Sequence, residues 1–117
     1  MVGLDMYAFS KAKNEDDYTE FFYWRKNNAL HGWMENLAIS RGLVESGDDF
    51  NCKKLQLSFE DIKQLRHDVK VGLTPTNGFF FGTQEYSDFQ QEQDLLFCSK
   101  ATNILMDKRE VYYDSWW

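Results

Sequence analysis

The sequence predicts a single compact α+β domain, residues 1–117, in which a small and mostly antiparallel sheet of about three strands is covered by three helices. Near both ends of the chain, and in a shorter segment in its middle, residues alternate with the two-residue period of a β-strand. Three longer segments without internal proline lie between them, and two of these follow a helix-capping sequence. A chain of 117 residues can bury a core without disulfides or metals.

The first strand is predicted at residues 4–10, LDMYAFS, where two sets of residues alternate with the period of a strand. A long helix is predicted at residues 17–41. Asn14 or Asp16 could cap its start, and Gly42 could end it as a left-handed residue. The apolar residues expected to face the core from this helix are Tyr23, Leu30, Met34 and Leu37.

A short second strand is predicted at residues 53–58, KKLQLS, where two leucines alternate with polar residues. Ser58 with Asp61 resembles a capping box, so a second helix follows directly. Gly72 and then Pro75 end this helix. Its apolar face comprises Phe59, Ile62, Leu65 and Val69.

The last third of the chain predicts a turn, a helix and a strand. The Asn-Gly pair at 77–78 favours a tight turn. Ser87 with Gln90 again resembles a capping box, and the helix after it extends to about Asp107. The tail at 109–117, REVYYDSWW, alternates and predicts the final strand.

Four motifs stand in a specific order along the chain. They are VGLDMY at 2–7, FFYWRKNNALHGWM at 21–34, LTPTNGFFFG at 73–82 and YYDSWW at 112–117. Together they resemble a family of small proteins encoded mainly by bacteriophages and prophages, whose members open with MGLDMYL and carry YWRKxNxIHxWF and GFFFG motifs. The resemblance extends over nearly the whole chain.

This resemblance implies a viral accessory protein that acts in the cytoplasm of a bacterial host, and it leaves the target open. Some family members carry the label phosphoglycerate kinase. That enzyme needs two large domains and a nucleotide site, whereas this short chain has no Gly-rich phosphate loop.

Composition excludes several classes of protein. Hydrophobic residues make up 43% of the chain and aromatic residues 17%, which is too apolar for a disordered protein. No apolar run is long enough for a membrane helix, so we expect no membrane partner. The first residues do not have the pattern of a signal peptide. The net charge of −6 argues against direct binding of nucleic acid, which requires a basic face.

A candidate site lies along the long helix predicted at 17–41. On a helical wheel a second stripe is formed by Trp24, Asn28, His31 and Glu35. In a functional interpretation His31 is an acid or base, Glu35 orients it, and Trp24 is a stacking wall beside the amide of Asn28.

Two cations stand next to this stripe, and Arg25 and Lys26 could hold an anion. The alternative is a central helix whose polar side chains satisfy loop backbone groups and each other. The functional interpretation predicts that Arg25 stays at least partly exposed to solvent. It also predicts that His31→Ala leaves the fold mostly intact. Leu30→Ala, by contrast, is expected to open a cavity.

The sequence predicts no metal site, no catalytic residue and no cofactor. His31 and His67 stand on different predicted helices, and no Cys/His cluster occurs. Cys52 and Cys98 form no C-x-x-C pair, so we expect two reduced thiols that are not bonded to each other.

Clustered aromatic residues provide two further candidates. Three phenylalanines at 79–81 lie between glycines, and neighbouring side chains of an extended segment point to opposite faces. The segment is either buried on both sides or presents Phe80 to a partner. The same question applies to Trp116 and Trp117 at the chain end.

Two functions are compatible with these observations. The first is a viral protein that binds and inhibits a host protein, such as a component of antiviral defence. The second is a small-ligand binder, for a nucleotide or another anion, or a minor enzyme built on the polar stripe. A pocket converging on Arg25, Asn28 and His31 favours the second, and a convex aromatic or acidic surface favours the first.

Overall fold

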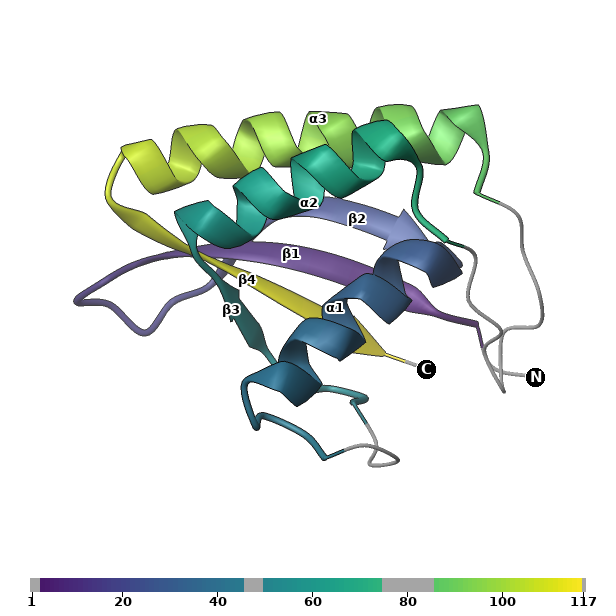
Figure 1. Ribbon diagram of the computed structural model, residues 1–117. Coiled ribbons are helices and arrows are strands. Elements are labelled where there is room, and N and C mark those ends of the chain that lie inside the picture. Colours follow the sequence, from purple (N-terminus) through teal and green to yellow (C-terminus); the bar gives the residue numbers. More distant parts are fainter. Residues whose placement is uncertain (1–2, 46–49, 75–85, 117) are drawn as a thin grey trace.

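A computed structural model describes residues 3–45, 50–74 and 86–116, and Figure 1 shows its arrangement. A four-stranded sheet packs against three helices, so the predicted α+β class is confirmed, with four strands where about three were expected. In chain order the elements are β1 (Asp5–Ala12), β2 (Thr19–Arg25), α1 (Asn28–Ser40), β3 (Leu55–Leu57), α2 (Phe59–Val71), α3 (Asp88–Met106) and β4 (Arg109–Trp116).

The first and last strands form the centre of the sheet. The strand order is β2-β1-β4-β3, and each neighbouring pair is antiparallel. β1 and β4 pair along their whole length, from Asp5 opposite Trp116 to Ala12 opposite Arg109. The register between β1 and β2 shifts at a bulge that leaves Phe21 as the extra residue of β2.

The helix predicted at 17–41 is wrong in its first half, because Thr19–Arg25 form the strand β2 and α1 begins only at Asn28. The physical reason is the residue content of β2, in which threonine, phenylalanine, tyrosine and tryptophan favour an extended backbone. Lys26 then turns the chain with a positive φ of 55°. The side chain of Asn27 caps the new helix.

This change of element alters which residues reach the core. Tyr23 was expected to be buried on the helix, but it lies on β2 with 45% of its surface exposed. Leu30 and Met34 do lie on α1 and are fully buried, so this part of the prediction is confirmed. Leu37 is half-buried against the same core.

Some of the predicted helix boundaries are confirmed and others are wrong. Gly42 ends α1 with a left-handed φ of 74°, and Gly72 ends α2. Asn14 and Asp16 instead lie in the loop between β1 and β2. The turn at 77–78 lies outside the described residues. Both predicted capping boxes are confirmed, Ser58 with Asp61 and Ser87 with Gln90.

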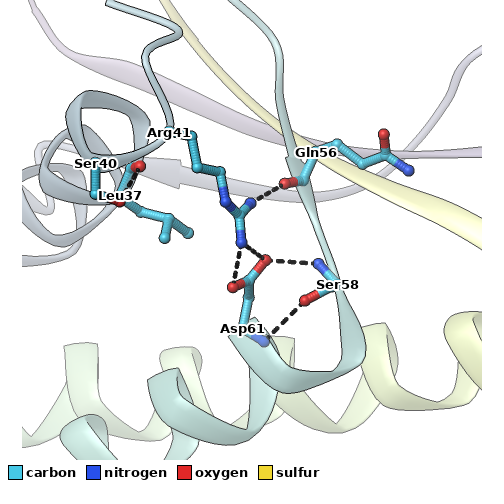
Figure 2. Close-up of polar contacts among 6 residues, drawn as sticks. All are labelled: Leu37, Ser40, Arg41, Gln56, Ser58 and Asp61. Atoms are coloured by element: carbon cyan, nitrogen blue, oxygen red, sulfur yellow. Dashed lines mark hydrogen bonds and ion pairs between the residues drawn. The ribbon is translucent and has the colours of Figure 1, made fainter.

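Arg41 joins the end of α1 to the start of α2, as Figure 2 shows. Its guanidinium donates to the backbone carbonyl of Gln56 in β3 at 2.7 Å and to both carboxylate oxygens of Asp61 in α2. The Asp61 carboxylate also accepts the Ser58 N–H at 2.8 Å. Burial alone would raise the pKa of Asp61, but hydrogen bonds from Arg41 and Ser58 hold that pKa below its ordinary value.

The core lies between the helices and one face of the sheet. Alternate residues of the central strands point into it, and all three helices contribute side chains to the same cluster. Its largest fully buried side chains include Trp24, Tyr113, Phe50, Phe97, Leu4, Met6, Leu30 and Met34. No helix of the described chain covers the other face of the sheet (Figure 1).

Leu30→Ala should lower the free energy of unfolding by about 2–5 kcal/mol, because it leaves a cavity beneath α1 where Leu30 is fully buried. Urea denaturation measures this change. The matched control is Leu96→Ala, at a half-exposed position of α3, which should change stability by less than about 1 kcal/mol. Equal losses in the two variants would contradict the assignment of α1 to the core.

Candidate functional site

The polar stripe predicted on one helix is divided between two elements. Trp24 is on β2, whereas Asn28, His31 and Glu35 are on α1. Trp24, Asn28 and His31 are all buried in the core, so they do not line an open pocket. Glu35 is half-buried, and burial raises the pKa of its carboxyl.

His31 is a packed part of the core, with 5% of its surface exposed. Its Nδ1 shares a hydrogen bond of 2.7 Å with the hydroxyl of Tyr113 in β4, and its ring stacks on Phe50 at 5.5 Å. Burial lowers the pKa of His31 to about 4, so the ring is neutral at pH 7. His31 thereby contacts the C-terminal strand β4. The sequence predicts that His31→Ala leaves the fold mostly intact. Because His31 is buried and hydrogen-bonded in the core, this substitution is instead expected to destabilise the fold clearly.

The main polar cluster of the core centres on Asp94, which the sequence reasoning missed. Asp94 lies on α3 and is 0% exposed. Its carboxylate accepts hydrogen bonds from Trp24 Nε1 at 2.9 Å, from Asn27 Nδ2 at 3.0 Å and from the hydroxyl of Tyr86. Burial raises the pKa of Asp94 to about 6, and the three donors limit the rise.

A signal for this cluster exists in the sequence. Asp94 precedes Phe97, Cys98 and Ala101 by three, four and seven residues, which places an acid on the buried face of an amphipathic helix. A carboxylate there requires donors from elsewhere in the fold. The sequence could thus have indicated a buried acid, but not its partners.

The remaining predicted site residues lie at the surface. The Arg25 side chain is 62% exposed and forms a 3.9 Å ion pair with Asp5. The prediction that Arg25 stays at least partly exposed to solvent is therefore confirmed. Lys26 is exposed, and its backbone N–H donates to the carbonyl of Leu4. Trp116 is 63% exposed and stands opposite Asp5 in the sheet register. Phe80 lies outside the described residues.

Arg25 and Trp116 belong to the face of the sheet that the helices leave uncovered. The register brings together Tyr7, Tyr23 and Asp114 across three strands, and places Phe9 opposite Tyr112. Five rings on this face touch in a chain, with centroid distances from 5.2 to 6.2 Å. We call them the open-face aromatic cluster, which consists of Tyr7, Phe9, Tyr18, Tyr23 and Tyr112.

Paired charges surround this cluster. Lys11 pairs with Glu110 at 3.0 Å, in addition to the pair between Arg25 and Asp5. A third pair joins Lys54 to Asp114 at 3.5 Å.

Two further interactions connect these charges to the aromatic rings. The ammonium of Lys54 lies over the rings of Phe9 and Tyr18, at 5.6 and 5.0 Å from their centroids. Burial, together with a hydrogen bond to Glu110, raises the pKa of the Tyr112 hydroxyl to about 12. The Tyr112 hydroxyl is therefore neutral at pH 7 and donates a hydrogen bond to Glu110.

Hollows also occur on the described surface. One of about 520 Å³ lies at β3 and is lined by Lys54, Gln56 and Tyr112 among others. Another lies between α1 and the end of α2. A hollow of about 460 Å³ there is lined by Trp33, Asn36, His67 and Asp68 among others, and by none of the predicted site residues. Trp33 Nε1 already donates to the Asp68 carboxylate at 2.8 Å. Within the described ranges no three His, Cys, Asp or Glu side chains are grouped so that they could hold a metal ion.

Comparisons with protein-family models, with curated proteins and with solved structures find no match. No helix among the described residues has the length and apolar character needed to cross a membrane. The open face of the sheet, which no helix of the described chain covers, is therefore the main structural clue to function.

His31 and Asp94 should affect the pH dependence of stability in opposite directions. His31 is protonated near pH 6.5 in the unfolded chain but only near pH 4 in the native protein. Its contribution to stability is therefore complete above pH 6.5 and is lost as the pH falls to 4. Native Asp94 titrates near pH 6 instead of 3.8, so its contribution is present at low pH and is lost as pH rises through 6. Each effect is roughly 3 kcal/mol at about 1.4 kcal/mol per pKa unit.

Urea denaturation between pH 4 and 7 tests this. Relative to wild type, stability of His31→Gln should fall more steeply as pH rises, and that of Asp94→Asn should rise more steeply. Only the slopes are compared, because both substitutions also change stability at every pH. Curves parallel to wild type would show that these groups do not titrate as described.

The two cysteines should differ in reactivity. Cys52 is exposed and Cys98 is buried, where burial raises the pKa of its thiol to about 12. A thiol reagent should therefore modify one cysteine in the native protein and both in denaturant. Protection of Cys52, or an intramolecular disulfide under non-reducing conditions, would contradict this assignment.

Proposed function

We propose that the protein is a viral accessory protein that binds and inhibits a host protein in the bacterial cytoplasm, such as a component of antiviral defence. We propose further that it binds through the open face of its sheet. The observation that supports this is the open-face aromatic cluster, with Trp116 beside it. The viral setting is supported by the resemblance of the four sequence motifs to phage-encoded proteins.

The composition of the open face is typical of an interface. Monomeric proteins rarely expose connected apolar patches, whereas single exposed apolar residues are common. Tyrosine, tryptophan and arginine are also the residues that most often dominate binding energy at interfaces. On this face Tyr18, Tyr23, Arg25 and Trp116 are all exposed at one surface.

The proposed partner is a protein and not a nucleic acid. Aromatic side chains on an open four-stranded sheet can stack with bases, but such surfaces combine stacking with a positively charged groove. Here Lys11, Arg25 and Lys54 are each paired with a carboxylate on the same face. The net charge of the chain is −6.

A small-ligand site on the polar stripe is not proposed. Trp24, Asn28 and His31 lie in the core and form its internal contacts. Arg25 points to the opposite face of the sheet, where it pairs with Asp5. The residues of that alternative therefore do not converge on one pocket.

The test is expression in a bacterium that carries a defence system restricting a phage. Wild-type protein should restore plating of that phage or slow host growth. Tyr23→Ser combined with Trp116→Ser should reduce the effect by about tenfold or more, because each loses an interface-type aromatic side chain from the open face.

The matched control is Phe89→Ser combined with Leu96→Ser, which removes two exposed apolar side chains from α3. This variant should act like wild type, and thermal unfolding should show that both double variants are folded. Loss of the effect in the α3 variant alone would move the binding surface to the helices. No effect of wild-type protein on any defended host would contradict inhibition of defence.

A further inference from the structure

We infer that the open face recognises a basic, arginine-bearing segment of its protein partner. This inference rests on the proposed function and specifies the chemistry of the partner. Three observations carry it: an acidic loop at one end of the open-face aromatic cluster, an internal lysine over two of its rings, and the partly exposed Asp5 carboxylate beside two others.

The acidic loop, residues 13–20, connects β1 to β2 and includes the first two residues of β2. Residues 13–20 contain Glu15, Asp16, Asp17 and Glu20 but a single lysine, which gives this segment a net charge of −3. All four acids are exposed, and within the described ranges none of them forms an ion pair. The segment therefore provides negative charge that is not neutralised by a neighbouring cation of the described chain.

This loop lies directly against the aromatic cluster. Tyr18 belongs to the same segment, and its ring packs edge-on against Phe9 and Tyr112 at 6.2 and 5.2 Å. A partner that covers the rings would consequently also approach the acids on either side of Tyr18. Aromatic area and negative charge are thus parts of one surface.

Lys54 demonstrates that the rings accept a cation. Its ammonium lies over Phe9 and Tyr18 while it pairs with Asp114. The other half of the cluster, Tyr7 and Tyr23, has no such internal cation over it among the described residues. The Asp5 carboxylate lies beside these rings and accepts the Tyr23 hydroxyl at 2.7 Å. Its ion pair with Arg25 is long, at 3.9 Å, and about a third of the Asp5 side chain stays exposed.

Arginine fits this second half better than lysine does. Its planar guanidinium stacks on an aromatic face and can bind a carboxylate through two parallel hydrogen bonds. A partner arginine over Tyr7 and Tyr23 would reach Asp5, and its neighbours would face the acidic loop. This arrangement would repeat, between two proteins, the geometry that Lys54 makes within this one.

The test uses a fluorescein-labelled oligoarginine peptide, with binding followed by fluorescence anisotropy. Wild-type protein should bind it, and more tightly than an oligolysine peptide of equal length. Tyr7→Ser combined with Tyr23→Ser should weaken binding by about tenfold, because two cation–aromatic contacts are lost. Tyr7→Phe combined with Tyr23→Phe should keep most of the affinity, which separates ring stacking from loss of the fold.

Charge controls distinguish the open face from the overall acidity of the chain. Asp16→Asn combined with Asp17→Asn should weaken peptide binding several-fold. Glu60→Gln combined with Glu92→Gln, which removes the same charge from exposed positions of α2 and α3, should change it by less than about twofold. Equal losses in the two charge variants, or unchanged binding in the serine variant, would overturn the inference.

The inference and the proposed function can fail separately. If the open-face variants lose their effect on the host while oligoarginine does not bind wild-type protein, the face is an interface for a partner that is not basic. Binding of a single-stranded oligonucleotide in place of oligoarginine would likewise overturn the inference. If the host effect survives Tyr23→Ser with Trp116→Ser, the proposed use of this face is wrong whatever the peptide does.

Discussion

The buried carboxylate of Asp94 is the constraint on which the rest of the structure depends. It has no exposed surface, so its two oxygens must be satisfied from within the fold. The donors come from Trp24 on β2, Asn27 before α1 and Tyr86 before α3. One side chain of α3 thereby fixes where β2 ends and where α1 begins. Asn27 acts twice, since its Oδ1 also accepts the Leu30 N–H at the start of α1.

This arrangement explains why residues that resemble an active site are structural. Anchoring Trp24 beneath α3 places the inward residues of β2 in the core, and the ring packs against Phe97 at 4.8 Å. The start of α1 then lies over the sheet, where His31 meets Tyr113. A histidine in such a setting contributes packing and hydrogen bonding, and its neutrality follows from burial. The same packing uses one face of the sheet completely and leaves the aromatic residues of the other face outside.

The open-face aromatic cluster could be predicted only in part. The alternation in β1 separates Tyr7 and Phe9 from Met6 and Ala8, so the sequence does show that β1 has an aromatic side. It does not show which strands stand beside β1. Tyr23 joins Tyr7 because β2 pairs with β1, and Tyr112 joins Phe9 because β4 pairs on the other side. The helix predicted at 17–41 would take Tyr23 away from this surface, although β2 contains residue types that favour strands.

By itself the sequence determined the α+β class, the capping boxes of α2 and α3, the left-handed glycine after α1 and the strands at both chain ends. These features depend on side chains within a few residues of one another, so local spacing is sufficient to show them. Only the tertiary structure decided that residues 19–25 form a strand, that Asp94 holds three distant donors, and that His31 is enclosed by Phe50 and Tyr113. Each of these depends on partners many positions away. The residue types of 19–25 are compatible with a strand, and the pairing with β1 decides between strand and helix.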